Sequence, residues 1–329
     1  MRPFKYTSAG SLDEAVSLLG SDGNGAVRPL AGGTDLLTLM KSDIVAPEQL
    51  IDIKRADGLT GGVQETADGV SLGALTTLAE IETHPLLRER YPALSEAAAA
   101  AATPQLRNMA TIGGNLLQRP RCWYYRNPRF HCWLKGGDEC QARDGENQRH
   151  AIFNVSPCVA THPSDLATAL VALDAAVRLR GPDGERSLPL TDFFTVPDDA
   201  RRTENVLRPV ELVLEITIPA ANDRRSTYLK AMDRKAWAFA LVGVAAALRV
   251  DDGRMRDARL VLGGVAPIPW RVREAELLLD DVEPTPELLT QVTETALRGA
   301  QPLARNAYKL SLAQTLIRRA LENLTGATK

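Results

Sequence analysis

The chain has 329 residues, which is enough for two or three packed units. Its formal charge of −2 gives no electrostatic reason to expect a nucleic acid as partner. No run reaches the roughly 18 apolar residues of a membrane span, and the N-terminal stretch lacks the apolar core of a signal peptide. The composition therefore favours a globular protein with no nucleic acid and no membrane span.

The first third of the chain alternates predicted strands and helices. Ser11 and Glu14 form a capping box that opens a short helix. A strand at 27–30 leads through a glycine pair into a helix at 36–41. Further strands are predicted at 50–53 and 70–75, and helices at 78–87 and 93–102.

The later part changes from an α/β to an α+β pattern. A helix is predicted at 166–172, followed by a hairpin of strands at 176–180 and 186–190. A β-rich run at 212–218 ends at Pro219, and the polar segment 220–226 is the best candidate for a domain boundary. Beyond it we expect strands at 227–233 and 259–265, a hairpin turn at 251–253, and helices at 239–248, 285–297 and 312–324.

Two loops carry paired glycines, Gly32-Gly33 and Gly113-Gly114. Glycines let backbone N–H groups approach a bound anion, and the start of a following helix adds free N–H groups. This chemistry suits a diphosphate. A tight turn is the alternative for one isolated pair, and a second such loop weakens it. Neither loop has the G-x-G-x-x-G or G-x-x-x-x-G-K-S/T pattern, so neither a Rossmann site nor a P-loop is predicted.

All four cysteines fall in one window, at Cys122, Cys132, Cys140 and Cys158. A group of thiols in a chain otherwise free of cysteine favours one shared metal centre. Iron–sulfur clusters accept varied spacings, whereas four-cysteine zinc sites usually show a C-x2-C pair. Disulfides need an oxidising compartment. The spacing favours a cluster and leaves zinc, disulfides or unrelated cysteines as alternatives.

Taken in order, five segments resemble landmarks of the FAD-binding medium subunit of the xanthine dehydrogenase, or molybdenum hydroxylase, family. They are 29–36, 110–116, 163–166, 211–219 and 228–230. The cysteine window is inserted between the second and third segments. This insertion resembles the sub-branch that holds the 4-hydroxybenzoyl-CoA reductase β subunit and the FAD subunit of periplasmic aldehyde oxidoreductase, in which the extra loop carries a [4Fe–4S] cluster.

The resemblance implies an α/β plus α+β fold. A two-lobed FAD-binding domain of the PCMH/vanillyl-alcohol-oxidase type is expected at 1–221, with lobes at about 1–56 and 57–221 and the inserted cluster loop at 118–160. A smaller α+β domain, similar to the C-terminal domain of CO dehydrogenase flavoproteins, is expected at 222–329. FAD is expected to lie extended between the lobes, with its isoalloxazine ring toward the C-terminal side.

The resemblance also implies roles for individual residues. FAD is expected to contact Pro29, Leu30, Ala31, Gly32, Gly33, Thr34, Asp35, Leu36, Ala101, Thr111, Ile112, Gly113, Gly114, Asn115, Asp165, Leu214 and Lys230. Asp165 is predicted to accept hydrogen bonds from the ribityl or ribose hydroxyls, or else Ser164 or Asp165 caps a helix. Leu214 and Lys230 are expected beside the ring system, with a surface lysine as the alternative for Lys230. The four cysteines become [4Fe–4S] ligands.

No acid–base pair or nucleophile–base set is visible around these motifs. We therefore expect no catalytic residues and an electron-transfer role. FAD would take electrons from a small [2Fe–2S] subunit, which drains a large molybdenum-cofactor subunit, and pass them to an external acceptor such as ferredoxin, quinone or oxygen. A cytoplasmic location is expected, or a periplasmic one if a signal-bearing partner exports the complex. A zinc-stabilised interaction module and a stand-alone flavin oxidase are the alternatives.

Overall fold

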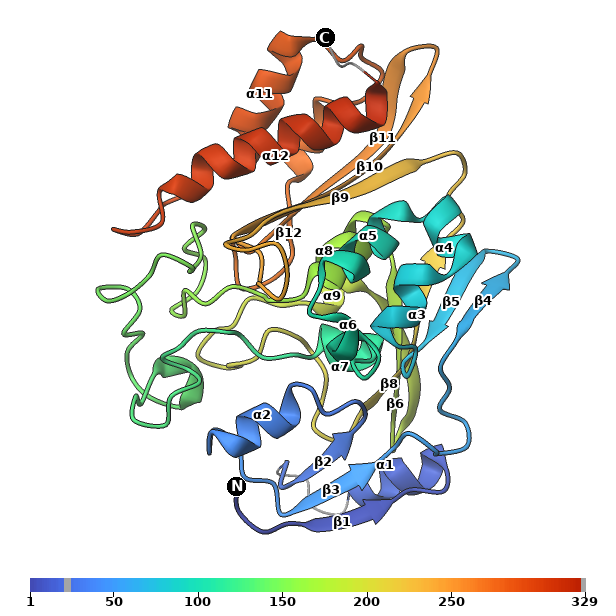
Figure 1. Ribbon diagram of the computed structural model, residues 1–329, viewed down its shortest axis with the longest axis vertical. Helices are drawn as coiled ribbons and strands as arrows, with labels where there is room; N and C mark the ends of the chain where they lie inside the picture. The colour runs from blue at the N-terminus through green and yellow to red at the C-terminus, as the bar shows by residue number, and fades with distance from the viewer. Residues whose placement is uncertain (21–24, 327–329) are drawn as a thin grey trace.

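The computed structural model describes residues 1–20 and 25–326. Three sheets follow one another along the long axis of the molecule, and helices α11 (Pro286–Ala296) and α12 (Tyr308–Thr325) lie at the C-terminal end (Figure 1). None of the helices within the described residues combines the length and the apolar character needed to cross a bilayer.

The first sheet is small and parallel. Its strands run in the order β1 (Lys5–Ser8), β3 (Gln49–Asp52), β2 (Val27–Leu30). Helix α1 (Leu12–Gly20) begins at the predicted capping box, since Ser11 Oγ accepts from the Glu14 N–H at 3.2 Å. Helix α2 (Leu36–Lys41) follows β2 at the bounds predicted from the sequence, so the first glycine loop lies at the carboxyl end of a parallel strand.

The second sheet has five antiparallel strands. Their order is β4 (Val63–Thr66), β5 (Gly69–Gly73), β8 (Leu212–Pro219), β6 (Ala176–Gly181) and β7 (Gly184–Pro189). The accompanying helices are α3 (Leu78–Thr83), α4 (Pro85–Arg90), α5 (Pro92–Ala100), α6 (Pro104–Arg107), α7 (Ile112–Leu116), α8 (Asp165–Ala172) and α9 (Leu190–Phe193). The single helix predicted at 78–87 is two helices, because Pro85 begins a new one at an extended His84.

The third sheet is antiparallel, in the order β12 (Trp270–Arg271), β11 (Arg254–Gly263), β10 (Val242–Asp251), β9 (Arg225–Ala231). Helix α10 (Arg273–Leu277) follows it. The helix predicted at 239–248 is wrong, because this segment forms strand β10. Residues Val242 to Leu248 are buried throughout, with α12 and α8 both packed against the strand. A strand buried on both faces reads as a continuous apolar run, which periodicity does not separate from a helix.

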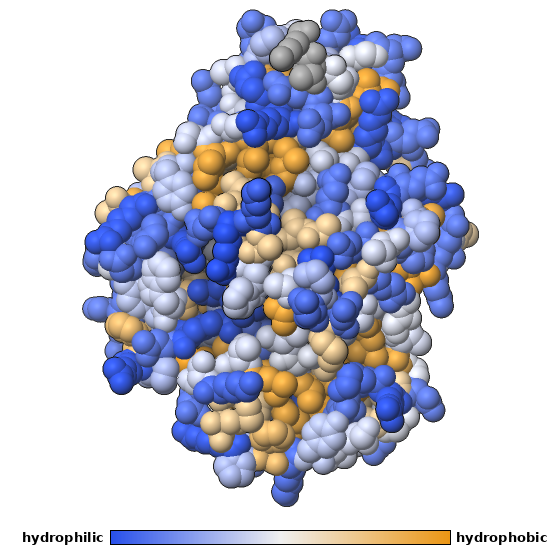
Figure 2. All heavy atoms as spheres, in the orientation of Figure 1, coloured by the Kyte–Doolittle hydropathy of each residue, from blue (hydrophilic) through white to orange (hydrophobic). Residues whose placement is uncertain are grey.

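The insertion at 118–160 has almost no regular structure. Its one described helical element is the 3-10 turn η1 (Trp133–Lys135). In place of backbone hydrogen bonds between regular elements, the side chains of Lys135 and Arg202 bind carbonyl groups of the insertion. Lys135 Nζ donates to the carbonyls of Tyr124 and Asn127, and Arg202 donates to those of Trp133 and Gly137. The insertion lies at the left in Figure 1, and Figure 2, in the same orientation, shows mostly hydrophilic residues on that side of the molecule.

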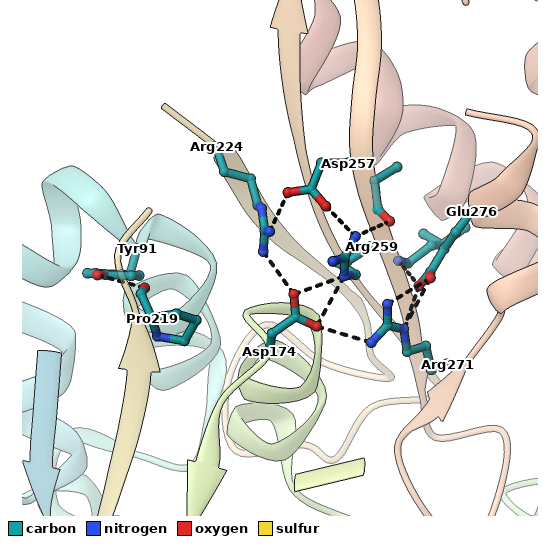
Figure 3. Close-up of polar contacts among 10 residues, drawn as sticks. Tyr91, Asp174, Pro219, Arg224, Asp257, Arg259, Arg271 and Glu276 are labelled. Carbon is teal, nitrogen blue, oxygen red and sulfur yellow. Dashed lines mark hydrogen bonds and ion pairs between the residues drawn. The ribbon is translucent and has the colours of Figure 1, made fainter. Parts of the chain in front are cut away.

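A group of ion pairs joins the second and third sheets. Asp174, just after α8, accepts hydrogen bonds from Arg259 at 2.9 Å and Arg271 at 3.1 Å (Figure 3). Arg224, in the segment before β9, bridges Asp174 and Asp257. These contacts fix the C-terminal sheet against the end of α8, whose residues are all buried.

Candidate cofactor site

A cavity of about 470 Å³ lies between the first sheet, helix α7 and the insertion. Its walls include most of the predicted FAD residues, namely Pro29, Leu30, Ala31, Gly32, Gly33, Thr34, Asp35, Leu36, Thr111, Gly113, Gly114 and Asn115. The cavity thus brings together the two glycine loops, which are about eighty residues apart in the sequence.

Glycine is required at two positions in this cavity for different reasons. Gly33 has a φ of +71°, a left-handed conformation that residues with a Cβ rarely adopt. At Gly32 a Cβ atom would lie 1.7 Å from the carbonyl oxygen of Met109. The first loop therefore packs directly on the chain leading into the second, and together they form one backbone-lined wall.

The insertion is bound to the first glycine loop through Asp35. One oxygen of Asp35 accepts from the Arg119 N–H at 2.9 Å, and the other accepts from Arg126 at 2.7 Å and lies 2.9 Å from Arg121. Asp35 precedes α2 but makes no capping bond with its side chain. Its carboxylate thus joins the predicted flavin loop to the cysteine segment.

Asp165 and Lys230 form a buried pair. Asp165 accepts from Lys230 Nζ at 2.8 Å and from the Tyr228 hydroxyl at 2.5 Å, and Lys230 also donates to the Ala100 carbonyl. Burial raises the pKa of Asp165, against the effects of Lys230 and Tyr228. Lys230 is therefore not a surface lysine, since its side chain is 2% exposed. Ser164 is the N-cap of α8.

Three predicted FAD residues lie in the apolar core. Ala101, Ile112 and Leu214 are buried and are absent from the walls of both cavities described in this subsection. Ile112 is 0% exposed, because it begins α7 with its side chain turned into the main core. Their contacts with FAD stay predictions.

A smaller cavity of about 70 Å³ lies between the insertion, the start of α8 and the third sheet. Cys122, Trp123 and His150 line it from the insertion, and Asp165 and Gly264 line it from the other elements. Arg121 lines both cavities, and its guanidinium lies 4.8 Å from the centre of the Phe239 ring. The two cavities therefore adjoin at Arg121.

The four cysteines lie near one another and form no disulfide. Cys132 and Cys158 share one small buried cluster, Cys140 packs against a second, and Cys122 packs against both. Within the described part of the chain, no three His, Cys, Asp or Glu side chains are close enough to hold a single metal ion. The thiols thus lie in two neighbouring clusters that share Cys122.

Charge interactions also connect the thiols. The side chains of Cys140 and Cys158 are hydrogen-bonded, which lowers the pKa of Cys140 to about 6 and raises that of Cys158. Burial raises the pKa of Cys122 to about 11, and the nearby Cys140 and Cys132 add to this rise. A neighbouring thiol whose charge affects a pKa lies close by, so these pKa shifts agree with the packing of the four cysteines.

Sequence reasoning missed several residues that shape these sites. His150 Nε2 lies 3.2 Å from Cys122 Sγ, and Lys309 Nζ donates to the carbonyls of His150 and Gly264. His131, which adjoins Cys132 in the sequence, is exposed. No sequence signal separates the two histidines, because His150 reaches Cys122 only through the path of an irregular loop.

A glycine-lined cavity between the first sheet and helix α7, followed by a third sheet packed against α12, is the arrangement expected of a flavin-binding subunit. The family described as "FAD binding domain in molybdopterin dehydrogenase" matches residues 2–221, and "CO dehydrogenase flavoprotein C-terminal domain" matches residues 227–324. The chain belongs to the family of FAD-binding medium subunits of molybdenum hydroxylases. It is thus an oxidoreductase subunit, and the predicted family and fold class are confirmed.

Individual relatives are similar to this chain over most of its length. It is 38% identical to the aldehyde oxidoreductase FAD-binding subunit PaoB of Escherichia coli, covering 95% of this chain and 96% of that protein. It is 30% identical to the glyceraldehyde dehydrogenase medium chain of Sulfolobus acidocaldarius, covering 83% and 79%. The solved carbon monoxide dehydrogenase from Hydrogenophaga pseudoflava, which lacks the Mo-pyranopterin moiety of its cofactor, superposes with a TM-score of 0.78 at 29% identity and 99% coverage of both chains.

Proposed function

We propose that this chain is the electron-transfer subunit of an aldehyde oxidoreductase-like molybdenum hydroxylase, and that its insertion holds a [4Fe–4S] cluster. Electrons would come from [2Fe–2S] centres of a small partner, which drains a large molybdenum-cofactor subunit, and leave through FAD to an external acceptor. The observation that carries the proposal is that the four cysteines pack in two neighbouring clusters that share Cys122, which also lines the smaller cavity.

The larger cavity would hold FAD in an extended form. The glycine loops would hold the diphosphate, with Gly32 and Gly33 giving the close approach that a side chain would block. The isoalloxazine end would point toward the smaller cavity, next to Asp165 and the third sheet. When bound, FAD supplies a carrier that exchanges electrons singly or in pairs.

The proposal of a cluster rests on the number and grouping of the thiols. Four cysteines pack in two neighbouring clusters that share Cys122, and an iron–sulfur cluster takes four thiolates. Cations lie near them: the hydrogen bond from Cys158 is the main cause that lowers the pKa of Cys140, Arg143 adds to it, and Arg119 interacts with Cys158. Burial, with smaller effects of Cys140 and Cys132, raises the pKa of Cys122, and bound iron would stabilise its thiolate.

The histidines near the smaller cavity support electron transfer over acid–base catalysis. Burial lowers the pKa of His150 to about 4 and that of His162 to about 3. A general acid or base works best with a pKa near the operating pH. These side chains are therefore suited to neutral packing and hydrogen bonding, and oxidation of the organic substrate is assigned to the partner.

Iron, acid-labile sulfide and flavin should be quantified on the complex purified anaerobically with its neighbouring subunits. The partner [2Fe–2S] centres must be counted separately, so the same analysis is run on this chain expressed alone and reconstituted. We expect one FAD and one [4Fe–4S] cluster per chain. One zinc and no sulfide would favour the zinc-stabilised interaction module, and a colourless, iron-free protein would defeat the proposal.

A further inference from the structure

His150 is the one described histidine whose imidazole contacts a cysteine sulfur, with Nε2 at 3.2 Å from Cys122 Sγ. The residue is 2% exposed. A cysteine sulfur that binds iron does so as a thiolate and has no proton to donate. With the cysteines loaded, the ring nitrogen that faces Cys122 must therefore be the donor, which places an N–H on Nε2.

The position of His150 is fixed from several sides. Its ring packs edge-on against Trp123, with ring centroids 5.6 Å apart. Its carbonyl accepts from Lys309 Nζ at 2.9 Å and from Asn306 Nδ2 at 3.2 Å, and its N–H donates to Asn147. Lys309 is 0% exposed and also donates to Gly264, which lines the smaller cavity. Asn306 and Lys309, just before and at the start of α12, thus hold the backbone of His150 in place.

We propose that His150 is a positioning residue that donates a hydrogen bond from Nε2 to the Cys122 sulfur, and that this bond raises the reduction potential of the centre held by the cysteines. The inference rests on the proposed function, because it requires a redox-active cluster on these thiols. Reduction adds negative charge to the cluster and its sulfur ligands. A donor aimed at a ligand sulfur stabilises the reduced state more than the oxidised one.

The hydrogen bond between His150 and Cys122 lies on the side of the cysteine segment that faces the cavities. Cys122 and His150 both line the smaller cavity, which adjoins the larger cavity at Arg121. The other three cysteines are absent from the walls of both cavities. Cys122 is therefore the ligand nearest the expected flavin, and a donor to its sulfur acts on the side of the cluster that faces the flavin.

The test uses three variants of the reconstituted chain and measures the midpoint potential of the cluster by redox titration followed by electron paramagnetic resonance. His150→Leu removes the donor, His150→Gln keeps an N–H group, and His131→Leu makes the same change at an exposed histidine beside Cys132. We expect about a tenfold shift against reduction in His150→Leu, which is about 59 mV for one electron. The other two variants should stay close to the wild-type potential.

The outcomes separate this inference from the proposed function. A wild-type chain without iron and sulfide defeats both. An iron-loaded wild type whose potential is the same in His150→Leu overturns only the role of His150. If His150→Leu loses its iron while His150→Gln keeps both iron and potential, the N–H donor is still required and the inference stands. Loss of iron in both His150 variants would assign the residue to packing alone and overturn it.

Discussion

The glycine-lined cavity and the cysteine insertion lie side by side but are built in different ways. The cavity is formed by backbone at the ends of regular elements, with Gly32 and Gly33 at the carboxyl end of β2 and Gly113 and Gly114 in α7. The insertion has one 3-10 turn over more than forty residues. Its carbonyls are satisfied by lysine and arginine side chains, for example those of Lys135 and Arg202.

This difference determines how each region responds to change. In a wall formed by backbone, most positions accept different side chains, but a position where two backbone segments touch has no room for a Cβ and must be glycine. A loop held by long cationic side chains depends on each of those contacts, because no ladder of backbone hydrogen bonds replaces a lost one. Asp35 joins the two regions, since it lies in the first glycine loop and binds Arg121 and Arg126 of the insertion.

The largest effect is expected at Gly32. In Gly32→Ala the added methyl group would overlap the Met109 carbonyl, and the two glycine loops would have to separate. We expect FAD affinity to fall by about 100-fold or more, or about 2.7 kcal/mol, as measured by fluorescence titration of the apoprotein with FAD. Gly20→Ala, at the end of α1 with no atom within 4 Å of its new Cβ, is the matched control. Equal FAD affinity in the two variants would contradict a close approach at Gly32.

Cys132→Ser tests whether the cysteine insertion and the glycine-lined cavity bind their cofactors independently. Cys132 is buried in the small cluster with Tyr125 and Trp133 and is absent from the walls of both cavities. We expect the variant to lose its iron and to keep FAD, as measured by metal and flavin analysis of the same sample. His131→Ser, at the exposed neighbour, should keep both. Loss of flavin together with iron would mean that the regions fold as one unit.

Asp174→Asn tests the ion pairs that join the end of α8 to the third sheet. Asp174 has a φ of +54°, which asparagine tolerates, so the change removes charge and leaves the backbone as it is. The loss of charge-assisted bonds from Arg259 and Arg271 should cost about 2 kcal/mol of unfolding free energy. Asp281→Asn, with a φ of +55° and ion pairs at the surface, is the control and should change urea denaturation far less. An equal loss of unfolding free energy in the two variants would mean that the ion pairs of Asp174 do not hold the sheets together.

Lys309→Met probes the contact between α12 and the insertion. Burial lowers the pKa of Lys309 from 10.5 to about 7 in the folded chain. Between these values the unfolded chain binds one more proton, so stability should rise with pH by up to about 1.4 kcal/mol per unit. Below pH 7 both states are protonated and this slope disappears. Urea denaturation between pH 7 and 9 should show a smaller slope in the variant, and equal slopes would contradict a lowered pKa.

The regular elements around the larger cavity could be predicted because their signals are local. The bounds of β2 and α2, the hairpin of β6 and β7 and the capping box at Ser11 follow from glycine, proline and hydroxyl positions. Strand β10 could not be predicted, because its alanines are buried on both faces and its apolar residues show no alternation typical of a strand. The family and the grouping of the glycine loops were predicted correctly.

The geometry of the insertion could not be predicted, for a physical reason. The position of His150 depends on Asn306 and Lys309, more than 150 residues later in the chain. The interaction of Asp165 with Tyr228 and Lys230 likewise crosses from α8 to β9. Sequence patterns report neighbours along an element, whereas these contacts exist only after the third sheet has packed against the second.

Diffraction from crystals of the reconstituted chain, measured on both sides of the iron absorption edge, tests the central claim most directly. The account predicts one iron peak enclosed by the sulfur atoms of Cys122, Cys132, Cys140 and Cys158, with Cys122 nearest the smaller cavity. A zinc signal at that position, or four free thiols with no anomalous signal between them, would contradict it.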